Sequence, residues 1–185
     1  TSWLDRPLFS RFPFLTIEVF IFALILILAV ASRLYNLGER VISHDESLHT
    51  YFSWLLYNGT GYQHNPMMHG PLQFHLLALT YFLFGTSDFT ARLPHAIFSI
   101  LTIVMLWKWR RYLGRPGTLL AALFMLISPY MLYYGRYARN EVFAGFFGLL
   151  MLYAILRYEE LGKPRYLYLL SAVTVLHFTS KETAF

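Results

Sequence analysis

The sequence predicts an all-α integral membrane protein with about five transmembrane helices and two juxtamembrane helices in its first external loop. Three observations lead to this fold class. Hydrophobic residues make up 57% of the 185 residues and charged residues only 14%, whereas soluble domains average about 45–50% apolar and roughly 25% charged residues. Apolar runs long enough to cross a bilayer recur along the chain, and basic residues gather in the short segments between them. Apart from the fold class, the absence of cysteine from the sequence excludes disulfides and thiolate chemistry.

Five apolar runs are expected to cross the membrane, although the last two are short against the roughly 20 residues that a span requires. They lie near residues 14–32, 93–109, 117–134, 142–156 and 166–179. The first contains IEVFIFALILILAVAS. It is longer than the apolar part of a typical signal peptide, and no small-residue cleavage site follows it, so we interpret it as a retained transmembrane helix. Pro129 falls late in the third span and predicts a kink there.

The two remaining helices are expected to lie along the membrane surface, near residues 45–57 and 72–84. The first begins with Ser43 to Glu46, a match to the S-x-x-E capping box, and continues as an amphipathic pattern. The second lies between Pro71 and Gly85 and would be only about 20 Å long at 1.5 Å per residue. That length favours an interfacial or re-entrant segment over a span.

The distribution of basic residues predicts the orientation of this arrangement. With five spans, one side of the membrane holds the N-terminal tail with Arg6 and Arg11, the turn WKWRRYLGR and the turn RYEELGKPR. By the positive-inside rule this side is cytoplasmic, and so is the N-terminus. The segments HDES, GRYARNE and SKE then share the extracytoplasmic side. The net charge of +5 is therefore interpreted as membrane-flanking charge, and nucleic acid is not expected as a partner.

Each of the three polar segments on that outer side has an ordinary interpretation as well as a functional one. Glu46 could serve only as a helix cap, and Asp45 only as a first-turn charge that the helix dipole favours. The arginines around Arg139 could anchor lipid headgroups, or they could hold a phosphate. Lys181 and Glu182 could be interfacial anchors at the end of a span. His64 and His69 could bind a metal, but a packing role in their loop is more typical.

The order of these features resembles the GT-C superfamily of membrane glycosyltransferases. The sequence is most similar to the protein-mannosyltransferase and aminoarabinose-transferase branch, and within it to a bacterial and archaeal group described as flippase-activity-associated. The resemblance rests on motifs that follow one another in sequence: Asp45-Glu46 after the first span, HGPL, FGTSDFTARLP, SP followed by RYARNE, and TSKE. It covers about residues 16 to 185 and implies an integral protein of a prokaryotic cell membrane.

The resemblance implies a transferase that uses a polyprenyl-phosphate-linked sugar as donor at the outer membrane face. Asp45 would then be the general base or a group that positions the nucleophile, and a base contributes about 10²–10⁴-fold to a rate. The other implied site residues are Glu46 and Glu141 as acids and Arg136, Arg139 and Lys181 at the donor phosphate, with Arg92 and His69 as further candidates for substrate or phosphate binding. No cofactor is certain, and a divalent metal is left open.

Members of that family have many more spans, so the chain is expected to be part of a longer product. It begins at Thr1 and ends at Phe185, directly after SKETA. The alternative function is a truncated, non-catalytic relative that acts as an accessory or structural subunit of a larger membrane complex, with lipids and other membrane subunits as partners. A transporter or flippase is less favoured, because charge would then be expected inside the spans and Glu18 is the only clear candidate.

Overall fold

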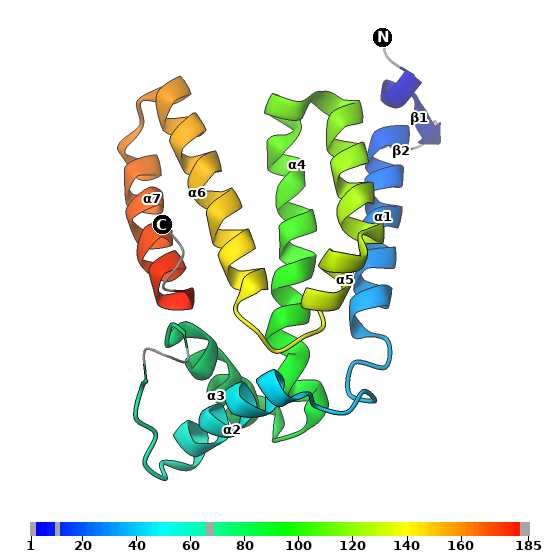
Figure 1. Cartoon of the computed structure of the whole chain (residues 1–185). Coiled ribbons are helices and arrows are strands. Elements are labelled where there is room, and N and C mark those ends of the chain that lie inside the picture. The colour runs from blue at the N-terminus through cyan, green and yellow to red at the C-terminus, as the bar shows by residue number, and fades with distance from the viewer. Residues whose placement is uncertain (1–2, 10–11, 66–68, 182–185) are drawn as a thin grey trace.

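The computed structural model describes residues 3–9, 12–65 and 69–181, and within them the protein is mostly helical (Figure 1). This confirms the predicted fold class. The helices are α1 (Ile17–Leu34), α2 (His44–Asn58), α3 (Leu72–Phe84), α4 (Asp88–Ile127), α5 (Pro129–Tyr134), α6 (Glu141–Leu161) and α7 (Pro164–Ser180). A short 3-10 helix, η1 (Trp3–Asp5), and the strands β1 (Pro7–Phe9) and β2 (Phe12–Thr16) precede α1.

The first helix starts later than the sequence pattern suggested, because the residues from 12 to 16 form an antiparallel hairpin with β1. Pro13 lacks a backbone N–H and restricts its own φ, which suits an extended edge strand. Thr16 then caps α1, where its side chain accepts a hydrogen bond of 3.4 Å from the backbone N–H of Val19.

The helix α4 is two helices joined at Gly114, which has φ 68° and ψ 173°. This combination of angles is essentially confined to glycine. The chain reverses there, so the two arms of α4 lie antiparallel in Figure 1. The arms contain the run 93–109 and the first part of the run 117–134, which the sequence analysis treated as separate spans.

Three helices within the described residues are long and apolar enough to cross a membrane: α1, α4 and α6. Because α4 reverses at Gly114, it supplies two antiparallel arms. At 17 residues, α7 is slightly shorter than such a helix, and α3 is a short apolar helix of 13 residues. The count of five spans stays a prediction. Figure 1 shows α2 and α3 together at one end of the upright helices (α1, α4, α6 and α7), beyond the end of α7 and beside the start of α4.

Pro129 separates α4 from α5 and leaves a backbone carbonyl without its usual helical donor, because the ring nitrogen carries no hydrogen. The carbonyl concerned is that of Met125, four residues earlier. Arg33, in the last turn of α1, donates to it over 2.8 Å and also donates to the carbonyl of Leu126 over 3.3 Å. The Arg33 side chain is fully buried. It therefore joins the end of α1 to the break between α4 and α5.

The apolar core lies between α1 and both arms of α4. Phe22, Ile25 and Ala29 of α1 pack with Ile103 and Leu106 of the first arm, among others. A second cluster joins α6 to α7. These two clusters hold the upright helices side by side. The polar turns that connect the helices therefore lie close together at the helix ends.

Candidate active site

Four charged side chains from three separate segments form one continuous chain of ion pairs, which we call the ionic chain: Asp45, Arg139, Glu141 and Lys181. Arg139 Nη1 lies 3.0 Å from Asp45 Oδ2, and Arg139 Nε lies 3.3 Å from Glu141 Oε1. Lys181 Nζ lies 3.2 Å from the same Glu141 oxygen. Two cations and two carboxylates thus alternate in one cluster.

Helix ends explain why these residues meet. Asp45 lies in the first turn of α2, Glu141 is the first residue of α6, and Lys181 is the C-terminal cap of α7. Helix dipoles favour acids at N-termini and bases at C-termini. Because α6 and α7 form an antiparallel pair (Figure 1), the start of one helix lies beside the end of the other.

The HGPL segment brings α3 against the end of α7. A Cβ atom added to Gly70 would lie 2.0 Å from the carbonyl oxygen of Thr179, far inside van der Waals contact. Only glycine allows this approach without a shift of the backbone. Gly70 therefore fixes the segment that carries Lys181 against the start of α3. Glu182 and Arg11 lie outside the described residues.

Glu46 does not join the ionic chain, although it is the neighbour of Asp45. Its carboxylate is fully buried and accepts two hydrogen bonds from Arg92, at 2.8 and 2.9 Å. It also accepts hydrogen bonds from Arg40 and from the backbone N–H groups of Ser43 and Ala138, at 3.0, 3.1 and 3.1 Å. Burial alone would raise the pKa of Glu46, but these donors, Arg92 foremost, hold it at about 2.

The geometry gives Glu46 and Arg92 a structural task, in contrast to the catalytic and phosphate-binding roles that the resemblance implied. A carboxylate at 0% exposure with five donors has no free face toward a substrate. Arg92 is 1% exposed and is engaged by Glu46 and by the carbonyls of Leu37 and Arg40. Together they connect α2, α4 and the turn before α6.

Arg136, which the resemblance placed at a donor phosphate, lies away from the ionic chain. Its guanidinium donates to the carbonyls of Ser32, Tyr35 and Asn36, at 3.3, 2.6 and 3.2 Å. These groups belong to the C-terminal end of α1 and the residues after it, where carbonyls lack helical partners. Arg136 thus satisfies the end of α1, while Arg139 in the same turn points to Asp45.

His69 lies beside a histidine that the sequence analysis did not single out. The rings of His69 and His49 are stacked with centroids 6.1 Å apart. His49 is buried in α2, four residues after Asp45 and therefore on the same helix face. Burial lowers the pKa of His49 to about 4, helped by the charges of His69 and Arg139 and opposed by those of Glu141 and Asp45. The i, i+4 spacing was the signal that could have found it.

The low pKa of His49 predicts that the protein loses stability on mild acidification. Between pH 6.5 and about 4 the unfolded chain binds a proton at His49 that the folded chain does not, so the free energy of unfolding falls as the pH drops. The contribution is roughly 3 kcal/mol over this window. We expect His49→Gln to flatten the dependence of the melting temperature on pH between 6.5 and 4.

His44→Gln is the matched control, because His44 is exposed on the first turn of the same helix. It should leave the pH dependence unchanged. Equal slopes for the wild type and His49→Gln would contradict the assignment.

A largely apolar cavity of about 490 Å³ adjoins the ionic chain. Glu141 belongs to both, since it contributes to the cavity lining and pairs with Arg139 and Lys181. The remaining walls come from the two arms of α4, from α5 and from one face of α6, with Arg33 of α1 and His177 of α7. Gly145 and Gly148 keep the α6 wall open. The arrangement places a charged cluster at the edge of an apolar chamber.

The comparison with known families agrees with this combination. A family model described as dolichyl-phosphate-mannose-protein mannosyltransferase matches residues 68–185, which is more than half of the chain. The chain belongs to this family. A comparison with curated proteins finds no match. Membership supports a membrane glycosyltransferase of the GT-C type, and the apolar helices agree with an integral membrane protein.

The part of the chain that matches the mannosyltransferase family contains His69, Arg139, Glu141 and Lys181, but it begins after α2. Asp45 is therefore connected to the matched part by structure alone, through its ion pair with Arg139. A second connection is the hydrogen bond between Glu46, the neighbour of Asp45, and the backbone N–H of Ala138, the neighbour of Arg139. These two contacts carry the inference that α2 belongs to the same site.

Two buried amides near the start of α3 and α6 were missed by sequence reasoning. Gln73 and Asn140 are both at 0% exposure, and neither has a hydrogen-bond partner for its side-chain amide among the described residues. The second carboxylate oxygen of Glu141 is also buried without a partner there. Buried amides normally have partners. No sequence signal marks them, because glutamine and asparagine are common at helix starts.

The sequence analysis left a divalent metal open, with His64 and His69 as residues that could bind it. Within the described residues, no group of three or more His, Asp or Glu side chains is arranged to hold a metal ion. His64 and His69 approach different rings: His64 lies near Phe74, and His69 stacks on His49.

Proposed function

We propose that this chain carries the catalytic base and the donor-phosphate clamp of a glycosyltransferase that uses a polyprenyl-phosphate-linked sugar at the extracytoplasmic face. The observation that carries the proposal is the double position of Glu141, in the ionic chain and in the wall of the apolar cavity. A lipid-linked sugar has the same two parts, a charged phosphate and an apolar tail, joined at one point.

In the proposed reaction an acceptor hydroxyl attacks the anomeric carbon of the sugar. A new C–O bond forms while the bond between that carbon and the phosphate oxygen breaks, and polyprenyl phosphate leaves with the bonding electrons. Asp45 takes the proton of the hydroxyl. The Asp45 side chain is 46% exposed, and only its Oδ2 has a hydrogen-bond partner among the described residues. Its Oδ1 can therefore accept the proton of the hydroxyl.

Arg139 and Lys181 would stabilise the negative charge that grows on the departing phosphate. Both are partly exposed, at 32% and 24%, and both are held in place by carboxylates before any donor binds. The donor phosphate would take over some of these contacts. Holding the cations ready in this way lowers the cost of ordering them during the reaction.

The family description names dolichyl-phosphate mannose as donor and protein as acceptor. For this chain we propose a broader substrate class, in which the donor is a sugar linked to a polyprenyl monophosphate and the acceptor is a hydroxyl group. The alternative of an accessory subunit would leave the ionic chain as a structural cluster, without effect on transfer when its charges are altered individually.

The cavity predicts a dependence on the length of the donor tail. Gly145 lines the cavity and has no atom within 4 Å of an added Cβ, so Gly145→Phe should fit without strain and fill part of the chamber. Excluding two tail carbons costs about 1.6 kcal/mol, or more than tenfold in affinity. We expect KM for a long-chain donor to rise by at least about tenfold, with kcat little changed.

A donor with a ten-carbon tail should lose less than about threefold, because its tail leaves the chamber partly empty. Gly145→Ala is the matched control and should behave as the wild type with both donors. Equal losses with long and short donors would mean that the substitution damages the headgroup site, and the tail would have to bind elsewhere.

A further inference from the structure

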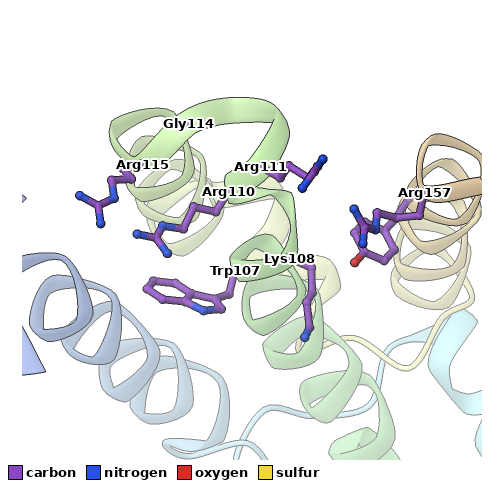
Figure 2. A pocket seen from close by; sticks show the side chains of 8 residues that line it. Trp107, Lys108, Arg110, Arg111, Gly114, Arg115 and Arg157 are labelled. Carbon is purple, nitrogen blue, oxygen red and sulfur yellow. The ribbon is translucent and has the colours of Figure 1, made fainter. Parts of the chain in front are cut away.

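A second charged region lies at the other end of the upright helices, around the reversal at Gly114, and we call it the basic pocket. It has a volume of about 570 Å³. Five basic side chains line it, four from α4 and one from α6, together with aromatic rings (Figure 2). The basic residues are Lys108, Arg110, Arg111, Arg115 and Arg157. None of them belongs to the ionic chain.

The half of the basic pocket that faces α1 is neutralised. Arg110 pairs with Glu18 at 2.6 Å, and its guanidinium also lies over the ring of Trp107. Arg115 pairs with Asp5 and, at 3.2 Å, with the same Glu18. Two cations therefore meet two carboxylates. This half needs no ligand to balance its charge.

The half that faces α6 has excess positive charge. Arg111 and Arg157 share a single carboxylate, Glu160, at 2.9 and 2.6 Å. Lys108 has no ion pair or hydrogen bond among the described residues. Three cations therefore face one carboxylate, an excess of two positive charges. Figure 2 shows Lys108 and Arg111 on α4 across from Arg157 on α6.

The apolar residues next to these cations are arranged as an anionic lipid requires. Leu101, Val104, Lys108 and Arg111 follow one another at spacings of three or four residues and so share one face of α4. Leu101 and Val104 are 39% and 42% exposed. The stripe is apolar over its first half and basic over its second.

The facing surface of α6 adds an aromatic ring and a cation. Tyr153 and Arg157 are four residues apart, so they share one face of α6, and both line the basic pocket. Tyrosine and tryptophan rings prefer the headgroup level of a bilayer, and Trp107 lies at the same level on α4.

We propose that the basic pocket binds the phosphate headgroup of an anionic phospholipid, whose acyl chains lie along the apolar half of the α4 stripe. Basic pockets between transmembrane helices are suited to such headgroups. From Arg92 to Lys108 the helix α4 rises about 24 Å at 1.5 Å per residue. The lipid would therefore lie near the bilayer surface opposite the ionic chain.

The test compares lipid binding by the full chain purified in detergent, with phosphatidylglycerol as the probe and phosphatidylcholine as the neutral reference. Native mass spectrometry gives a Kd from the fraction of protein that retains lipid at each concentration. The wild type should prefer phosphatidylglycerol. The double variant Lys108→Gln/Arg111→Gln should bind it about thirtyfold more weakly, the loss expected when two basic groups leave an anionic headgroup.

Two variants make the result interpretable. Lys163→Gln/Arg165→Gln removes the same charge from the N-terminal cap and first turn of α7, outside the pocket, and should stay within about twofold of the wild type. Lys108→Gln alone breaks no described ion pair, so it tests the pocket even if the double variant unfolds. It should weaken binding about fivefold.

Three outcomes would overturn the proposal. Equal weakening by the pocket variants and by the control would mean that lipid responds only to overall charge. Equal retention of phosphatidylcholine and phosphatidylglycerol by the wild type would mean that the pocket does not select a charged headgroup. Displacement of the lipid by millimolar glycerol phosphate would assign the pocket to a soluble phosphate compound.

Discussion

Replacing Asp45 with asparagine is expected to lower kcat for sugar transfer by about 10²–10⁴-fold, the usual contribution of a general base. Asparagine has nearly the same shape and can still accept the hydrogen bond from Arg139, which is now 3.0 Å long. It cannot take a proton from the acceptor hydroxyl. Initial rates with a polyprenyl-phosphate-linked sugar, measured over a range of donor concentrations, should show a lower kcat at a nearly unchanged donor KM.

Asp88→Asn is the matched control, because Asp88 is also an aspartate in the first turn of a helix but has no place in the ionic chain. It should keep wild-type kcat. If Asp45 only favours the start of α2 and pairs with Arg139, then Asp45→Asn would change stability by about 0.3–1 kcal/mol and leave kcat intact. Such a result would remove Asp45 from the mechanism.

The elements of this fold could be predicted because membrane helices are long and apolar, and their ends carry polar residues. The sequence also gave a physical reason to expect α3 to be too short for a span, and the helix has 13 residues. The meeting of Asp45, Arg139, Glu141 and Lys181 was predictable for the same reason. Each of these residues lies at or next to a helix end, and the predicted topology places those ends on the same side of the membrane.

The individual roles within each polar segment could not be predicted. Arg136 and Arg139 are three residues apart in one turn, yet one completes the end of α1 and the other pairs with Asp45. Glu46 and Asp45 are adjacent, and only the tertiary packing of Arg92 decides which of them is buried. Sequence spacing specifies which residues share a helix face. The direction in which a side chain of a turn points depends on contacts with segments that are distant in the sequence.

Replacing Glu46 with glutamine is expected to destabilise the protein by about 3–5 kcal/mol, the cost of breaking a buried ion pair on one side only. Glutamine fits the space but carries an NH₂ group where Arg92 donates two hydrogen bonds. The Arg92 guanidinium would then be buried, at 1% exposure, without a counter-charge. The melting temperature in detergent and the midpoint of denaturant unfolding measure the loss.

Glu39→Gln is the control for removing an acid nearby, since Glu39 is exposed and bonds only to Asn36 among the described residues. It should change stability by less than about 1 kcal/mol. The double variant Glu46→Gln/Arg92→Met should be more stable than Glu46→Gln alone, because it removes the unpaired buried charge. A Glu46→Gln protein as stable as the wild type would show that this pair does not hold α2 in place.

The substitutions at Glu46 and Asp45 distinguish a residue that holds the fold in place from a residue that takes part in the reaction. Glu46 bonds the backbone of Ala138, and the next residue on each side forms the Asp45–Arg139 pair. Loss of Glu46 should therefore lower both stability and transfer, because α2 would no longer hold its position against the turn. Loss of the Asp45 charge should lower transfer with little effect on stability, because the Asp45 side chain is 46% exposed and its ion pair with Arg139 is partly exposed. A variant at position 45 that unfolds as readily as one at position 46 would reverse this division of roles.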